Sequence, residues 1–166
     1  MKLGEVTFNN AKITRRDFAG KKFGPQYRTF SLIVEDPAVQ QKLAELGVDL
    51  WYPESTANNA EPPKARMNVV VRNQFGDVEI VLIMPDGSAM KLPENNWGDL
   101  DSMWIKDTDL FINIVRVKTF QGVEKTVAYL KTLYTKVMSS EEREALMAER
   151  QTVDPVKAKY ADLMRR

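Results

Sequence analysis

Apolar and polar residues alternate along much of the chain up to residue 137, which is the period of a β-strand with one buried face. Between residues 27 and 35 the even positions Phe30, Leu32 and Val34 are apolar, and the polar Thr29 and Ser31 alternate with them. Further strands are predicted over 48–52, 65–72, 78–84, 89–92, 110–120 and 123–137. The run from 78 to 84 is almost continuously apolar, which favours a strand that is buried on both faces.

Helical signals appear at three places. Asp36 followed by Pro37 is an N-cap with proline at the first helical position, so a short helix is predicted up to about residue 46. Ser139 and Glu142 have the spacing of a capping box, which opens a helix that runs to about residue 150. A last helix is predicted after Asp154, because apolar residues recur there at helical spacing.

This order of elements predicts a mainly β protein. Long alternating strands with connections too short for parallel crossovers favour an OB-type antiparallel Greek-key barrel with one short inserted helix and a C-terminal helical tail. A chain of 166 residues is typical of one domain. We therefore expect an OB-fold domain over residues 1–138 and a helical extension over 139–166.

The composition excludes many kinds of chemistry. The chain contains neither cysteine nor histidine, which removes structural zinc sites, thiol catalysis and every catalytic triad that needs imidazole. Its glycines are scattered and form no phosphate-binding loop. We predict no catalytic residue, no metal and no cofactor. The absence of a long apolar run and of a signal-peptide core predicts a cytoplasmic protein with no membrane partner.

The net charge of +1 conceals a strong segregation of charge along the chain. Residues 1–34 carry seven basic residues against two acidic ones, whereas residues 35–63 carry one basic residue against six acidic ones. Residues 64–73 and 111–138 are again basic. Such blocks are typical of a chain whose basic segments face a polyanion, although a surface that segregates its charge by chance is the alternative.

The basic segments also carry aromatic residues, and this combination suits single-stranded nucleic acid, because aromatic rings stack on bases while cations neutralise phosphates. The richest cluster lies between residues 15 and 28, where the alternative is that the aromatic rings pin a hairpin to the barrel. The candidate nucleic-acid-binding residues are Arg15, Arg16, Phe18, Lys21, Phe23, Tyr27, Arg28, Arg66, Arg72, Phe75, Arg116, Lys118, Phe120 and Lys131.

The tryptophans lie outside these basic clusters. Trp51 is next to an acidic loop that would repel phosphate, and Trp104, which we expect in the core, lies among four aspartates, as does Trp97, whose position the sequence leaves open. The aspartates at 99, 101, 107 and 109 lack the spacing of a calcium loop. Turn and cap roles are therefore predicted for them in preference to a divalent metal site of the nuclease type.

At this point a family resemblance is visible. The segment KLPENNWGDLDSMWIKDTDLFI at 91–112, followed by AYLKTLYTKV at 128–137, resembles the OB-fold single-stranded DNA-binding proteins of tailed bacteriophages. The basic strand RTFSLIV at 28–34 and the short helix after it are also similar. The resemblance covers residues from about 3 to 137, and its most specific pieces are Leu100-Asp101, Asp109-Leu110 and the segment 128–131.

The resemblance implies a protein that coats and protects single-stranded DNA without sequence preference during phage replication or recombination, and that is not an enzyme. It implies DNA contacts for Tyr27 and Arg28 at the start of a strand, and for Tyr129 and Lys131, where a position in the core is the alternative. Two departures are visible: the Gly-Trp-Asn step of the family is replaced by residues 47–49, and the chain ends in two arginines where many such proteins have an acidic tail. We expect self-association through the C-terminal helices, and replication or recombination proteins as further partners.

A protein of another class fits the same pattern. A β-barrel structural or assembly protein of a phage particle would use the charge blocks for complementarity between protein surfaces. A carboxylate-metal nuclease is a third and weaker alternative. Binding of oligonucleotides, and its dependence on salt, separates the first two hypotheses.

Overall fold

The computed structural model describes residues 1–53, 63–73 and 76–152. Its regular elements, in chain order, are β1 Lys2–Asp17, the 3-10 helix η1 Pro25–Tyr27, β2 Thr29–Ile33, α1 Pro37–Glu45, β3 Arg66–Val70, β4 Glu79–Ile83, β5 Ala89–Lys91, the 3-10 helix η2 Glu94–Asp101, β6 Ile105–Lys118, β7 Glu124–Val137 and α2 Ser140–Thr152. The predicted tail helix after Asp154 lies outside the described residues.

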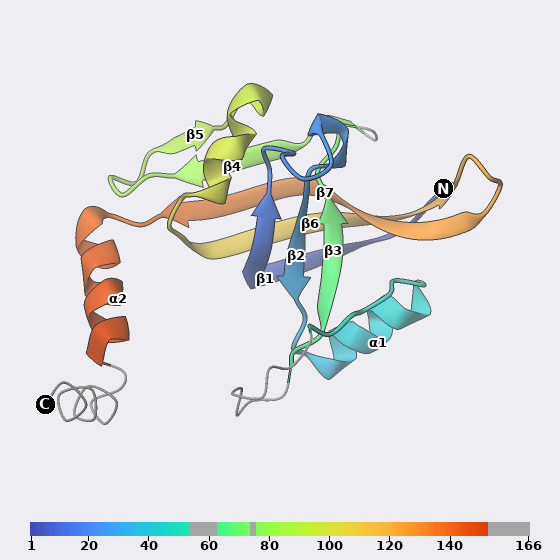
Figure 1. The fold of residues 1–166 in the computed structure, drawn as a ribbon, viewed down its shortest axis with the longest axis horizontal. Helices are drawn as coiled ribbons and strands as arrows, with labels where there is room; N and C mark the ends of the chain where they lie inside the picture. Colours follow the sequence, from blue (N-terminus) through green and yellow to red (C-terminus); the bar gives the residue numbers. More distant parts are fainter. Residues whose placement is uncertain (54–62, 74–75, 153–166) are drawn as a thin grey trace, which may run out of the picture.

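Five of the strands form a closed barrel. The sheet runs in the order β3-β2-β1-β6-β7-β4-β5, and an additional pairing between β3 and β7 joins its first and fifth strands. Figure 1 shows β1, β2 and β3 crossing in front of the long β6–β7 hairpin, with β4 and β5 at the upper edge. The predicted OB-type barrel is therefore confirmed, with β4 and β5 as an added flap.

The expectation of purely antiparallel pairing is wrong at two places. The barrel closes through a parallel pairing in which Val70 lies opposite Tyr129, and β4 runs parallel to the other half of β7. The chain reaches these positions by long routes, because β5, η2 and β6 all lie between β4 and β7. The connections between consecutive strands are short and therefore predicted antiparallel neighbours, whereas the parallel pairs join strands that are far apart in the sequence.

The core is built from the inward positions of the alternating strands. Phe30 and Leu32 of β2 and Met67 and Val69 of β3 are fully buried, as the alternation predicts. In β4, Ile80 and Leu82 are buried, but Val81 and Ile83 are only half-buried, so the prediction of a strand covered on both faces is wrong. β4 is the last strand but one of the sheet, next to the edge strand β5, and its second face is only partly covered.

Both described α-helices begin where the sequence predicts. The Asp36 carboxylate accepts a hydrogen bond from the Ala38 N–H, and Pro37 follows as the first residue of α1. At α2, the Ser139 hydroxyl accepts from the Glu142 N–H at 3.1 Å while the Glu142 carboxylate accepts from the Ser139 N–H at 3.3 Å. This reciprocal pair is the predicted capping box.

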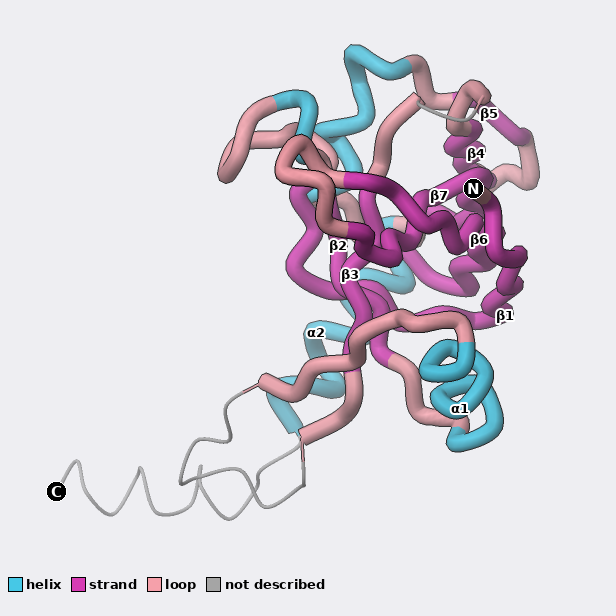
Figure 2. Tube along the Cα trace, turned by 90° about the vertical axis from the view of Figure 1, so that its right-hand side faces the viewer, coloured by secondary structure: helices cyan, strands magenta, loops and turns pink. Residues whose placement is uncertain are grey.

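The two helices differ in how they meet the barrel. α1 lies below the strands in both views and buries Leu43 completely (Figures 1 and 2). α2 extends from the end of β7 away from the strands (Figure 1). Within the described residues, no helix has the length and hydropathy to cross a membrane.

The predicted strand over 48–52 is not formed. Only Trp51 pairs, in an isolated bridge with Arg66 whose two backbone hydrogen bonds measure 2.9 and 2.8 Å. This single bridge nevertheless fixes where the tryptophan lies, beside the outer face of β3.

Candidate nucleic-acid interface

An open groove of about 440 Å³ lies on the outer face of β1, β2 and β3. Its floor is formed by outward-facing residues of the three strands, and one wall comes from the loop that joins β1 to β2. The groove is lined by Arg15, Asp17, Lys22, Phe23, Thr29, Ser31, Trp51 and Asn68.

Trp51 is the central side chain of this groove. The guanidinium carbon of Arg15 lies 4.7 Å from the centre of its ring, and that of Arg66 lies 5.6 Å from it. The indole N–H donates to the Asn68 side-chain oxygen at 3.0 Å, which also accepts from the Ser31 hydroxyl at 3.2 Å. The ring is therefore held in a fixed orientation between two cations, on a half-exposed surface.

The sequence did not identify Trp51 as a candidate because its neighbours along the chain are acidic. In the folded protein its neighbours are Arg15 and Arg66, which come from β1 and β3. The bridge to Arg66 places the tryptophan beside the basic residues of β1 and β3. An aromatic residue directly before a loop is a possible signal of a base-stacking position. The two arginines that flank it are brought there by tertiary structure and cannot be identified from the sequence.

The wall of the groove is a tightly bonded turn. The buried Asp17 carboxylate accepts hydrogen bonds from the backbone N–H groups of Lys21 at 2.8 Å and Lys22 at 3.1 Å. Gly20 supplies the positive φ of 69° that this turn requires. The turn leaves the side chains of Lys21, Lys22 and Phe23 exposed, with Phe23 at 71%.

A second carboxylate ties the same loop to η2. Asp101 accepts from the backbone N–H groups of Phe18 at 2.8 Å and Ala19 at 3.1 Å. Asp109 accepts from the Asn10 N–H, and Asp107 forms an ion pair with Lys136. These aspartates thus have turn and pairing roles, and the described residues contain no group of three or more carboxylates that would hold a metal ion.

Three of the predicted binding residues prove to be structural. Phe18 is fully buried and stacks on Phe30 with ring centres 5.3 Å apart, so its prediction as a base platform is wrong, and the alternative of an anchoring ring is confirmed. Arg28 has only 16% of its side chain exposed, because it forms an ion pair with Glu94 and lies over the Trp97 ring.

Arg16, the third, is directed inward. Its guanidinium donates to the backbone carbonyls of Leu100 at 2.7 Å and Met103 at 2.9 Å. Burial lowers the pKa of Arg16, and the nearby Asp101 carboxylate acts in the opposite direction. Arg16 therefore does not join Arg15 on the outer face, although both are predicted binding residues, because β1 has a register shift between Thr14 and Asp17 that directs the two side chains apart.

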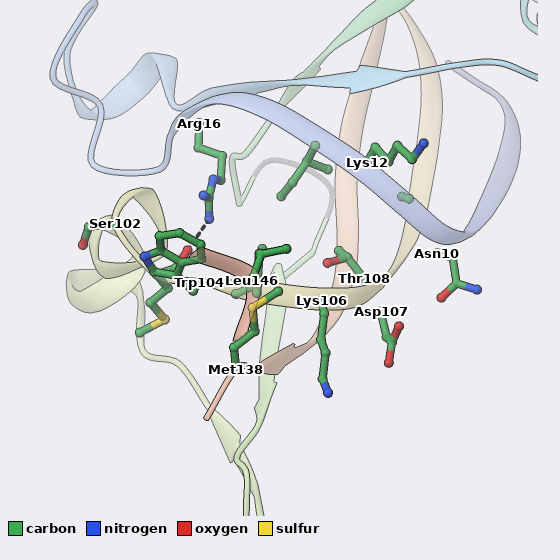
Figure 3. Close-up of a pocket in the computed structure, with 14 residues that line it drawn as sticks. Asn10, Lys12, Arg16, Ser102, Trp104, Lys106, Asp107, Thr108, Met138 and Leu146 are labelled. Atoms are coloured by element: carbon green, nitrogen blue, oxygen red, sulfur yellow. Dashed lines mark hydrogen bonds between the residues drawn. The ribbon is translucent and has the colours of Figure 1, made fainter. Parts of the chain in front are cut away.

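Arg16 reaches into a separate cavity of about 550 Å³ between β1, β6 and α2, which Figure 3 shows with Trp104 and Leu146 on its walls. Trp104, expected in the core, is only half-buried here and lies under Arg143 of α2. Trp97 is the buried tryptophan. The cation Lys106 on this cavity is paired with Glu142, so we assign the cavity to the attachment of α2.

The remaining predicted residues lie in two further places. Phe120 is fully exposed at the tip of the β6–β7 hairpin, and Arg116 and Lys118 lie on the strand that leads to it. This hairpin projects at the right of Figure 1. The turn is rigid, because the Gly122 N–H donates to the Thr119 carbonyl and the Val123 N–H to the Thr119 hydroxyl.

The other place is a small notch beside the β3–β7 seam, which contains Arg72 and Lys131. Tyr27 is exposed on η1, at 56%, and Phe75 lies outside the described residues. The structure thus brings together Arg15, Phe23 and Arg66 around Trp51, while the hairpin cluster stays apart. Contact of these exposed residues with DNA stays a prediction.

Comparison with known proteins supports the fold. No protein-family model and no curated protein sequence matches the chain. Among solved structures, the C-terminally truncated single-stranded DNA-binding protein of bacteriophage Enc34 is similar, with a TM-score of 0.51 and 9% identity over 82% of this chain and 87% of that one. The single-stranded DNA-binding protein gp2.5 of bacteriophage T7 gives a TM-score of 0.42 and 11% identity over 84% and 89% of the two chains. The chain therefore shares the OB-type fold of the Enc34 protein, and at the level of the fold the resemblance seen in its sequence is confirmed.

Proposed function

We propose that this protein binds single-stranded DNA without sequence preference, and that it coats the strand during phage DNA replication or recombination. The observation that carries the proposal is Trp51, which lies between Arg15 and Arg66 in an open groove on the outer face of the barrel. An aromatic ring flanked by cations is the arrangement that binds a base and its phosphate together.

The energies favour a base over the present arginine contact. A cation over an exposed aromatic ring contributes about 0.5–1 kcal/mol. Stacking of a base on an aromatic ring contributes about 1–3 kcal/mol. A base that replaces Arg15 over the indole also leaves the guanidinium available for the adjoining phosphate. The groove is therefore suited to exchange an internal contact for a stronger one with the nucleic acid.

Lack of sequence preference follows from the same geometry. Every base has a face that stacks, and the cations around Trp51 recognise phosphate rather than base edges. The Asn68 oxygen, which would otherwise read a base edge, is already occupied by Trp51 and Ser31. A duplex hides its base faces, so single strands are preferred.

Several finer features belong to the proposal. We assign DNA binding to residues 1–138 and self-association to the C-terminal extension at 139–166, with replication or recombination proteins as further partners. The role is one of binding with no catalytic step, and the proposed location is the cytoplasm of the bacterial host. The family likeness of the fold and the basic groove support this assignment.

The test is a titration of the protein with matched single-stranded and duplex oligonucleotides, followed by tryptophan fluorescence. We expect quenching and tighter binding of the single strand, with a logarithmic affinity that falls by about 0.7 per phosphate neutralised for each unit of log salt. Equal affinity for the two forms refutes the proposal. No binding of either form would instead favour the assembly protein of a phage particle.

A further inference from the structure

Strand β3 leads from the groove toward the seam where the barrel closes. Along this strand Met67, Val69 and Val71 point into the core, so the alternate residues face outward. These outward residues, in chain order, are Arg66, Asn68, Val70 and Arg72. At about 3.3 Å per residue, the path from Arg66 to Arg72 measures about 20 Å.

A small notch lies at the far end of this path. It has a volume of about 120 Å³ and is bounded by Arg72, Gly76, Asp77, Asn113, Tyr129, Leu130 and Lys131. The strand register explains its position: Val70 lies opposite Tyr129 across the seam, and Tyr129 lies opposite Asn113 on β6. The notch is well below the roughly 300 Å³ of a typical small-molecule site, and it admits one planar ring at most.

The chemistry of the notch is that of a nucleotide subsite. The Asn113 side-chain oxygen is buried and accepts no hydrogen bond among the described residues, so it can accept one from the N–H group of a base. Arg72 lies close enough to Tyr129 to act on its pKa, which burial raises. Two cations, Arg72 and Lys131, thus flank the notch for the phosphates on either side of that base.

Two acidic side chains near the notch repel phosphate, so the phosphates of a bound strand would lie away from them. Asp77 is part of the wall, and Glu5 accepts a hydrogen bond from Lys131 at 3.3 Å. The Glu5 carboxylate is also bonded to Lys2, and these two lysines lower its pKa. Because Lys131 shares Glu5 with a second lysine, it can turn to a phosphate without leaving that carboxylate unpaired.

We infer that one DNA strand occupies the groove and the notch together: it leaves Trp51, follows the outer face of β3 and places a second base in the notch. This inference rests on the proposed function, whose site it extends across the barrel seam. The 20 Å path corresponds to about six nucleotides at the 3.4 Å spacing of stacked DNA, and to about four when the strand is fully extended, which lies within the site sizes of OB folds. A strand of three nucleotides therefore reaches only one of the two places.

The test measures how the affinity for single-stranded DNA depends on strand length, with the notch intact and with its two cations removed. Dissociation constants of dT3 and dT12 are measured for the wild-type protein, for the double variant Arg72→Ala/Lys131→Ala and for the control Lys136→Ala. The exposed Lys136 lies farther along β7 and is paired with Asp107. The dissociation constant of the short strand divided by that of dT12 measures the advantage of reaching both places. In the double variant this ratio is expected to fall about tenfold or more relative to wild type. Lys136→Ala is expected to keep the wild-type ratio.

A longer strand can bind in more registers, which raises its apparent affinity by the same factor in every variant. This factor cancels when the ratios of the variants are compared. Thermal unfolding of each variant checks that the fold is intact, which we expect because both side chains are exposed. A double variant with the wild-type ratio overturns the inference, as does a Lys136→Ala protein with an equally reduced ratio. If neither dT3 nor dT12 binds the wild-type protein, the proposed function itself fails, which is a different result.

Discussion

Replacement of Trp51 by alanine should weaken binding of single-stranded DNA much more than it weakens the fold. The variant removes the one ring in the groove that two arginines flank, and with it the stacking of one base. Stacking of about 1–3 kcal/mol corresponds to an increase of about 5-fold to 150-fold in the dissociation constant. The measurement is fluorescence anisotropy of a labelled dT12 strand, which does not depend on the protein's own tryptophans.

The same substitution has a calculable cost in stability. It removes the hydrogen bond from the indole to Asn68, at about 0.5–1.5 kcal/mol, and two exposed cation–aromatic contacts at about 0.5–1 kcal/mol each. The backbone bridge between Trp51 and Arg66 is independent of the side chain and should survive. Urea unfolding should therefore show a loss of about 1.5–3.5 kcal/mol, which leaves an ordinary domain folded.

Two matched variants separate the loss of stacking from the loss of stability. Trp51→Phe keeps a stacking face but loses the indole N–H, so we expect most of the affinity to remain while part of the stability is lost. Trp104→Ala removes a tryptophan of similar exposure from the α2 cavity, and it should leave the dissociation constant unchanged. The reasoning is refuted if Trp51→Ala stays folded and binds dT12 as tightly as the wild-type protein.

Three further predictions concern the other cations, the hairpin and the helix cap. Arg15→Ala should weaken DNA binding with little change in stability, whereas Arg16→Ala should lower the unfolding temperature, because two carbonyls lose their donor; equal melting curves would contradict this assignment. Phe120→Ala should leave the melting curve unchanged, since the ring is fully exposed, and should weaken binding of long strands in the same anisotropy assay. The hydrogen bond from Lys106 lowers the pKa of Glu142 below its ordinary 4.5, so its contribution to α2 is complete above that pH and is lost as the pH falls through the lowered value. Far-ultraviolet circular dichroism should show this acid loss in the wild-type protein but not in Glu142→Gln.

Local signals in the sequence predicted the elements well. Asp36 and Pro37 specify the start of α1 through one side-chain hydrogen bond, and the capping box at Ser139 does the same for α2. The alternation of β2 and β3 predicted which side chains face the core. Each of these features depends on residues within a few positions of one another, so the sequence alone contains the information.

The candidate site depended on contacts that no local pattern reveals. Phe18 and Phe23 are both aromatic residues in one basic loop, but Phe18 stacks on Phe30 and Phe23 faces solvent. Trp51 belongs to an acidic stretch of the sequence and yet lies between arginines of β1 and β3. Strand register decides these contacts, because it determines which distant residues become neighbours.

The closure of the barrel by a single pairing has a consequence for its motions. Among the residues that the structure describes, β3 and β7 share a single register pair, Val70 with Tyr129, whereas β6 and β7 pair from Ile105 opposite Val137 to Lys118 opposite Glu124. Separation of the seam breaks few hydrogen bonds, so local opening there needs less free energy than opening of the β6–β7 ladder. In native-state hydrogen exchange, the amides near Val70 should therefore lose protection first, and the central β6–β7 amides should exchange only when the whole domain unfolds.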